Sequence, residues 1–166
     1  MRHAFLMLVL LATPAWSAGA AQGRAYVIDG DTLDIHGQRF RLHGVDAPES
    51  GQYCLAQTGS WQPCGRTSAF ALQDFIGTDV VSCEARDRPS YGRTVAECFV
   101  RGTSINRWLA RQGLAVAVPS FTMAYVPDEM QARSASVGIW ATRFTEPYRW
   151  RKGQRLPGEP GSKKNG

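Results

Sequence analysis

Charged side chains gather in three short stretches of the chain, residues 29–32, 41–49 and 87–93, which hold the groups best suited to chemistry. Each stretch lies at the end of an expected strand or in a loop. The first stretch, Asp-Gly-Asp-Thr, is by turn chemistry alone most typical of a hairpin turn. It gains interest only from the acids and arginines in the other two stretches.

Carboxylates in the first two stretches could bind a hard divalent cation. Asp46 and Glu49 flank Pro48, which stiffens the backbone between them. Asp31 and Asp46, with a backbone carbonyl and water, would suit calcium, which prefers oxygen ligands and tolerates a flexible shell. Glu49 would then remain available for proton transfer. A set of solvated surface charges and salt bridges is an equal alternative for this stretch taken alone.

Two arginines accompany these acids. Arg41 lies on the strand that leads into the second stretch, and Arg93 follows Tyr91-Gly92 in the third. A phosphodiester gains negative charge towards its five-coordinate transition state, and planar guanidinium groups can bind that charge in bidentate fashion. Acids and arginines together predict phosphodiester chemistry, although Tyr91-Gly92-Arg93 alone could be a turn followed by a surface arginine.

The elements that must position these residues are short. Polar and apolar residues alternate from Arg24 to Val45, which predicts three strands in a meander. A helix is expected over Arg66–Ile76, and two more strands over Val80–Glu84 and Thr94–Val100.

Two further helices are expected after the caps Ser104 and Asp128. Five strands and three helices are consistent with a small barrel capped by helices, which periodicity leaves as one topology among several.

The chain has 166 residues and a formal net charge of +5. We expect a signal peptide over residues 1–20, one domain over 21–152 and a disordered tail over 153–166. A membrane anchor is the alternative for the first segment, but its apolar run stops at Thr13-Pro14, short of the roughly 20 residues that a span needs. The prediction is therefore a monomeric periplasmic or secreted protein without membrane attachment, whose positive charge permits a polyanionic partner.

Four cysteines in a protein bound for an oxidising compartment predict disulfides. Three pairings are possible, and we favour the two local ones because each closes a loop. These pairs are Cys54 with Cys64, and Cys83 with Cys98. A zinc site is the alternative, although the close Cys-x2-4-Cys spacing typical of structural zinc is absent from the sequence.

From about Tyr26 to Trp140 the sequence resembles the staphylococcal nuclease, or thermonuclease, family. The matching segments, in chain order, are Val27-Ile28-Asp29-Gly30-Asp31-Thr32, Arg41-Leu42, Asp46-x-Pro48-Glu49, Tyr91-Gly92-Arg93, Arg111-Gln112-Gly113-Leu114-Ala115 and Gly138-Ile139-Trp140. The resemblance implies an α+β, mainly β fold, an OB-fold five-stranded barrel with three helices. It also implies an exported hydrolase that cuts DNA and RNA with calcium and leaves 3′-phosphate ends.

The resemblance also implies roles for individual residues. The implied site consists of the calcium ligands Asp31, Asp46 and Ala47 (through its carbonyl), the general base Glu49, and the phosphate-binding arginines Arg41 and Arg93. Tyr91 is expected to touch a substrate phosphate, and Asp29 is interpreted as a structural residue of the turn.

The sequence departs from the family pattern around the expected nucleotide pocket. Ser90 stands where the type member has a lysine, and Pro119 and Phe121 are nearest to its pocket tyrosines. We therefore expect base stacking and end preference to differ. The isolated histidines His36 and His43 are assigned no catalytic role.

The main alternative function is a non-catalytic OB-fold module that binds single-stranded nucleic acid or another polyanion. Acids beside a phosphate path weaken such binding unless a cation is present. The retained carboxylates therefore favour the nuclease.

Overall fold

The computed structural model of this protein describes residues 20–161. The expected signal peptide, apart from Ala20, lies outside the described residues, and so do residues 162–166 of the expected tail. Within the described part, no helix is long and apolar enough to cross a membrane.

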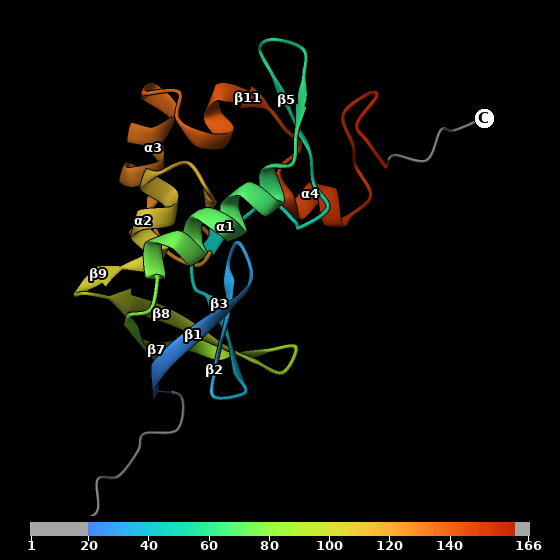
Figure 1. Cartoon of the computed structure of the whole chain (residues 1–166). Coiled ribbons are helices and arrows are strands. Elements are labelled where there is room, and N and C mark those ends of the chain that lie inside the picture. The colour runs from blue at the N-terminus through green and yellow to red at the C-terminus, as the bar shows by residue number, and fades with distance from the viewer. Residues whose placement is uncertain (1–19, 162–166) are drawn as a thin grey trace, which may run out of the picture.

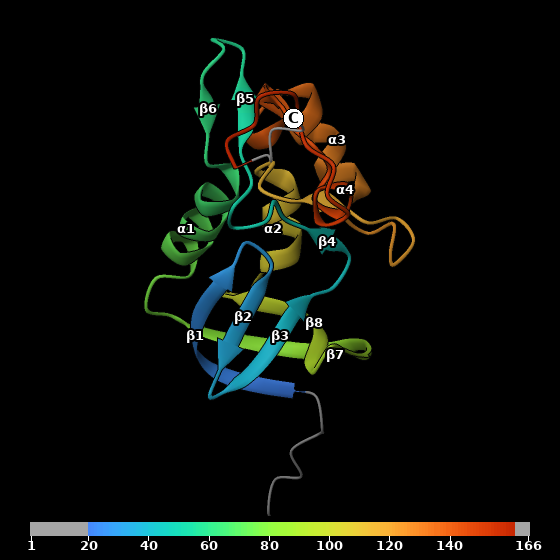
Figure 2. The ribbon, with the colours of Figure 1, turned by 90° about the vertical axis from the view of Figure 1, so that its right-hand side faces the viewer.

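Five strands form a closed barrel, seen in the lower half of the molecule in Figures 1 and 2. The barrel strands are β1 (Ala20–Asp29), β2 (Thr32–Ile35), β3 (Gln38–Leu42), β7 (Val80–Ser90) and β8 (Arg93–Val100). Neighbours pair antiparallel in the order β3-β2-β1-β7-β8, and parallel pairing of β3 with β8 closes the ring. The predicted five-stranded OB-fold barrel is confirmed.

The barrel is filled by alternate residues of its strands, as a period of two requires. Leu33 and Ile35 of β2 and Phe40 and Leu42 of β3 are fully or almost fully buried. Helical side chains such as Leu72 close the same core from above. Burial of one face of each strand fixes the register, so residues at the strand ends have defined positions.

Helices cover one end of the barrel (Figure 2). The helical elements are α1 (Cys64–Ile76), α2 (Ile105–Arg111), α3 (Val126–Ser134), the 3₁₀ helix η1 (Gly138–Ala141) and α4 (Pro147–Arg151). The first three are the predicted helices, and α4 was not predicted.

Helix starts agree only partly with the expected caps. The Ser104 hydroxyl accepts a hydrogen bond from the Arg107 backbone N–H at 3.3 Å, as predicted for the cap of α2. The prediction of Asp128 as a cap is wrong, because α3 begins at Val126 and Asp128 lies in its first turn. There its carboxylate pairs with the Arg107 guanidinium.

Short strands connect the barrel to the helical layer. They are β4 (Val45–Asp46) paired with β10 (Val116–Ala117), β5 (Cys54–Ala56) paired with β6 (Trp61–Gln62) and β11 (Thr142–Arg143), and β9 (Thr103–Ser104) beside β8. Both predicted disulfides are confirmed, Cys54 with Cys64 and Cys83 with Cys98. The first joins β5 to the start of α1, and the second joins barrel strands β7 and β8.

The prediction of a disordered tail from residue 153 is wrong for residues 153–161. Glu159 is buried and its carboxylate accepts hydrogen bonds from the Trp150 indole N–H at 2.7 Å and the Tyr53 backbone N–H at 3.3 Å. The guanidinium of Arg155 also stacks 3.6 Å from the centre of the Trp150 ring. A polar, glycine-rich composition predicted disorder. The hydrogen bonds that the buried Glu159 carboxylate accepts hold this stretch against the domain.

Candidate active site

The turn between β1 and β2 places Asp31 at the end of the barrel. The Asp29 carboxylate accepts a hydrogen bond from the Asp31 backbone N–H at 3.0 Å, which supports the structural role expected for Asp29. A side chain at Gly30 would begin 2.6 Å from the Ala47 Cβ. Only glycine therefore lets this turn lie against the segment that carries the second group of acids.

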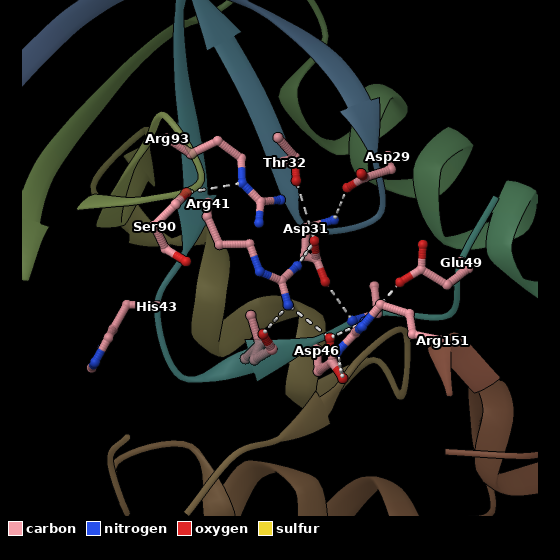
Figure 3. A network of polar contacts seen from close by, with 12 residues as sticks. Asp29, Asp31, Thr32, Arg41, His43, Asp46, Glu49, Ser90, Arg93 and Arg151 are labelled. Atoms are coloured by element: carbon pink, nitrogen blue, oxygen red, sulfur yellow. Dashed lines mark hydrogen bonds and ion pairs between the residues drawn. The ribbon is translucent and has the colours of Figure 1, made fainter. Parts of the chain in front are cut away.

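Strands β3 and β4 bring Arg41 and Asp46 to the same place (Figure 3). The Arg41 guanidinium forms ion pairs with Asp31 and with Asp46, the latter at 2.7 Å from Nη2 to Oδ1. Both aspartates are only 4% exposed. Burial lowers the pKa of Arg41 from its ordinary value, although Asp46 acts to raise it. One arginine thus bridges two buried carboxylates that are expected to share a metal ion.

Both oxygens of the Asp31 carboxylate accept hydrogen bonds. Its Oδ2 accepts a hydrogen bond from the Ala47 backbone N–H at 2.7 Å, and its Oδ1 accepts one from the Thr32 hydroxyl at 3.3 Å. These contacts join the β1–β2 turn to the chain after β4, residues that lie 16 apart in sequence. Asp31, Asp46 and Ala47, the three expected calcium ligands, therefore meet in one compact region.

The backbone of Glu49 is held in place by hydrogen bonds with Gln52. Its carbonyl accepts the Gln52 backbone N–H at 2.7 Å, and its N–H donates to the Gln52 side-chain oxygen at 3.2 Å. A Cβ at Gly65 would lie 1.7 Å from the Glu49 carbonyl oxygen, so the start of α1 packs directly on this turn. The Glu49 side chain remains about one-third exposed and faces the acids.

Tyr91, in the turn between β7 and β8, and Arg93, the first residue of β8, approach from the same side. The Arg93 Nε donates to the Ser90 carbonyl at 3.5 Å, and its guanidinium points towards Arg41 in Figure 3. The Tyr91 side chain is 95% exposed. His43 also lines the cleft, but its side chain points away from the acids.

A cleft of about 980 Å³ unites these residues. Its lining includes the expected site side chains Asp31, Arg41, Asp46, Glu49, Tyr91 and Arg93, together with Ser90, Pro119 and Phe121. Phe121 is exposed, with its ring centre 6.0 Å from that of His43. The cleft therefore has an acidic centre, arginines around it and aromatic side chains on its rim.

Sequence reasoning missed Arg151, which enters the same centre from α4. Its Nη1 lies 2.9 Å from Asp46 Oδ1 and 2.7 Å from Glu49 Oε1, and its Nη2 lies 2.9 Å from Asp46 Oδ2. Burial acts to lower the pKa of Arg151, but hydrogen bonds with Asp46 and Glu49 outweigh it and raise the pKa. The basic residues between Arg149 and Lys152 are visible in the sequence, but the contact of Arg151 with Asp46 and Glu49 is not.

Gln52 was also missed, and nothing in its sequence context marks it. Its side chain is fully buried and its Nε2 donates to the Thr145 carbonyl at 2.5 Å. Because Gln52 also holds both backbone groups of Glu49, it links the expected base to the segment that carries Arg151.

The donor set fits a hard cation. Two buried carboxylates within reach of one guanidinium are oxygen ligands of the kind calcium prefers, and backbone carbonyls and water can complete its shell. Among residues 20–161, no group of three His, Cys, Asp or Glu side chains is arranged to hold a metal. Glu49 lies beside the two carboxylates and is linked to Asp46 through the Arg151 guanidinium.

Comparisons with known proteins agree with this geometry. A family model described as staphylococcal nuclease homologue matches residues 39–142. The chain is 40% identical to a succinoglycan biosynthesis protein, ExoI, of Rhizobium meliloti, over 82% of this chain and 73% of that protein. It is 26% identical to a micrococcal nuclease of Shigella flexneri over 90% of both chains. It is also 28% identical to a thermonuclease of Staphylococcus intermedius, over 75% of this chain and 80% of that one.

The matched region contains Arg41, Asp46, Glu49 and Arg93, and Asp31 lies just before it in the turn that Arg41 contacts. The family model covers more than half of the chain, and the barrel has the fold that the resemblance implied. This chain belongs to the staphylococcal nuclease family.

Proposed function

We propose that this phosphodiester-hydrolysing nuclease is exported, depends on calcium, and cuts DNA and RNA to products with 3′-phosphate ends. The observation that carries the proposal is the pair of buried aspartates, Asp31 and Asp46, bridged by Arg41 in a cleft that also holds Glu49 and Arg93. A buried pair of acids is costly without a counter-charge, and a divalent cation supplies two positive charges at once.

Glu49 is proposed to act as the general base. Its partly exposed carboxylate can accept a proton from a water molecule as the water oxygen bonds to phosphorus and the P–O5′ bond breaks. A calcium ion held by Asp31, Asp46 and the Ala47 carbonyl would polarise the phosphate and bring the attacking water close. The reaction is a direct hydrolysis in which the leaving 5′ oxygen ends as a hydroxyl after taking a proton from solvent.

Arg41 and Arg93 are proposed to bind the charge that grows on the phosphate oxygens. Both guanidinium groups line the cleft, and they lie next to each other in Figure 3. Planar guanidinium groups match a phosphate in bidentate fashion, as an ammonium group does not. The exposed Tyr91 lies on the same loop and is proposed to contact a neighbouring phosphate.

Two disulfides suit the oxidising compartment that export would provide. We infer a periplasmic or secreted monomer without membrane attachment. Mass spectrometry of the protein from the medium and periplasm would test this, since cleavage near residue 20 would place the mature N-terminus at the start of β1.

The test of activity incubates the purified protein with single-stranded DNA, duplex DNA and RNA, first with calcium and then with excess chelator. Calcium-dependent fragments that carry 3′-phosphate ends support the proposal. Tight binding without cleavage would favour the alternative of a non-catalytic nucleic-acid-binding module. An acidic polysaccharide without phosphodiester bonds belongs in the same experiment, because one relative is named as a succinoglycan biosynthesis protein. It should remain intact.

A further inference from the structure

Arg151 forms ion pairs with two acids of the candidate site, Asp46 and Glu49. It pairs with Asp46 through both of its terminal nitrogens and with Glu49 through one. It reaches these residues from a position 105 residues beyond Asp46 in sequence. The family model ends at residue 142, so Arg151 lies outside the matched region.

Every carboxylate oxygen of the two expected metal ligands already accepts a hydrogen bond or an ion pair. Asp46 Oδ1 is shared by Arg41 and Arg151, and Asp46 Oδ2 is taken by Arg151 alone. Asp31 is held by Arg41, Thr32 and the Ala47 N–H. A cation that binds Asp46 must therefore share or displace a guanidinium.

Of the two guanidinium groups, Arg151 is the easier to displace. Its side chain is 41% exposed, whereas that of Arg41 is 19% exposed and lies between both aspartates. An exposed guanidinium recovers hydration when it leaves its partner, which lowers the cost of its departure.

The segment that carries Arg151 is anchored without this contact. Gln52 holds the Thr145 carbonyl before α4, and Glu159 binds the Trp150 indole within it. The Arg155 guanidinium donates to the Trp150 carbonyl at 2.6 Å. The helix therefore delivers Arg151 to the acids, and loss of the Arg151 contact should leave the helix in place.

We propose that Arg151 is a built-in counter-cation of this site, a residue that neutralises Asp46 and Glu49 in the metal-free protein and that calcium displaces from Asp46. Arg151 thereby sets the calcium affinity. This inference rests on the proposed calcium dependence. It follows from charge: three carboxylates faced by two guanidinium groups attract a dication less strongly than the same carboxylates faced by one.

The direct test is calcium binding, measured by titration calorimetry on the whole folded protein. Arg151→Gln, which keeps length and hydrogen bonding but removes the charge, should bind calcium about tenfold more tightly than the wild type. Arg149→Gln is the matched control, because Arg149 lies on the same helix and pairs with Glu146 outside the acidic centre. It should bind calcium as the wild type does.

Stability gives a second readout that needs no catalysis. Arg151→Gln should unfold at a lower temperature than the wild type in chelator, and this difference should shrink or vanish in saturating calcium. Arg149→Gln should show the same small difference in both conditions. A merely structural role for Arg151 would lower stability equally with and without calcium, and this result would overturn the inference.

The outcomes separate the two proposals. A wild type that binds calcium, with an Arg151→Gln variant that binds it no more tightly, overturns the role of Arg151 alone. A wild type that neither binds calcium nor cuts nucleic acid overturns the calcium-dependent function as well. If Arg151→Gln does not fold, Arg151→Lys decides, because one ammonium cannot pair with both Asp46 oxygens as the guanidinium does. Its calcium affinity should exceed that of the wild type, and equality would refute the proposal.

Discussion

Two of the segments that border the cleft, named the first and the second wall, are built in different ways. The first wall, residues 29–49, is short in sequence, and its buried aspartates Asp31 and Asp46 lie beside strands whose register the barrel core fixes. The second wall, residues 145–161, follows the last short strand and is held by individual side chains, chiefly Gln52 and Glu159. The first wall supplies the acids and Arg41, and the second supplies Arg151. The difference suggests that the first wall carries the chemistry and the second adjusts it.

The largest effect should come from the first wall. Glu49→Gln removes the proposed base while leaving its turn intact, since Gln52 and α1 hold the backbone of residue 49. Turnover of DNA at saturating calcium should fall by about 10²- to 10⁴-fold, with the melting temperature nearly unchanged. Initial rates and thermal unfolding measure both.

Glu146→Gln is the matched control for this change. Glu146 lines the same cleft but is exposed and pairs with Arg149 at 3.2 Å, away from the acidic centre. Its removal should leave turnover within a few-fold of the wild type. Equal losses in the two variants would mean that negative charge in the cleft matters and that Glu49 is no base.

The next prediction concerns the two proposed phosphate-binding arginines, Arg41 and Arg93, which should differ in their contribution to stability. Both Arg41→Gln and Arg93→Gln should lower turnover, because each removes positive charge from the transition state. Of these two arginines, Arg41 is the one that pairs with buried carboxylates, so Arg41→Gln in chelator should lower the free energy of unfolding by about 3 kcal/mol. Arg93→Gln should change it by less than about 0.5 kcal/mol, because Arg93 makes one long hydrogen bond in the loop.

Urea denaturation with chelator and with calcium measures this contrast. Calcium should not rescue Arg41→Gln fully, because Asp31 loses its ion pair with the Arg41 guanidinium, while a metal restores charge in another geometry. Equal destabilisation by the two substitutions would show that the bridge between Asp31 and Asp46 contributes little to folding.

The two disulfides differ in their distance from the site: Cys54–Cys64 lies beside the Glu49 turn, and Cys83–Cys98 lies within the barrel. Replacing either cysteine pair by alanine should lower the free energy of unfolding by about 3 kcal/mol in the chain-entropy account. The Cys54–Cys64 bond joins β5 to the start of α1, which packs on the Glu49 carbonyl, so its loss should also lower turnover. Loss of Cys83–Cys98, which joins two barrel strands, should affect stability alone. Rates at a temperature where both variants are folded test this difference.

What could be predicted from the sequence follows the same division. The barrel strands were predictable because alternation marks them, whereas their closure into a barrel and the roles of Asp31, Asp46 and Glu49 were implied by the resemblance to the nuclease family. The second wall has no periodicity to mark it. Arg151 and Asp46 are in contact although they lie 105 residues apart in sequence. The helix that carries Arg151 is held by hydrogen bonds to Glu159, which lies in a stretch whose composition indicates disorder.

The smallest expected effect tests whether the second wall is a separate unit of stability. Trp150→Phe removes the indole N–H that donates to Glu159 at 2.7 Å but keeps a ring beneath the Arg155 guanidinium. A lost hydrogen bond to a buried carboxylate costs about 1–2 kcal/mol. Because few barrel contacts depend on this bond, the cost should appear as faster amide exchange confined to residues 145–161, with the barrel amides unchanged. Faster exchange throughout the barrel would instead show that the two walls unfold together, and Arg151 would then have to be counted as part of the barrel's own stability.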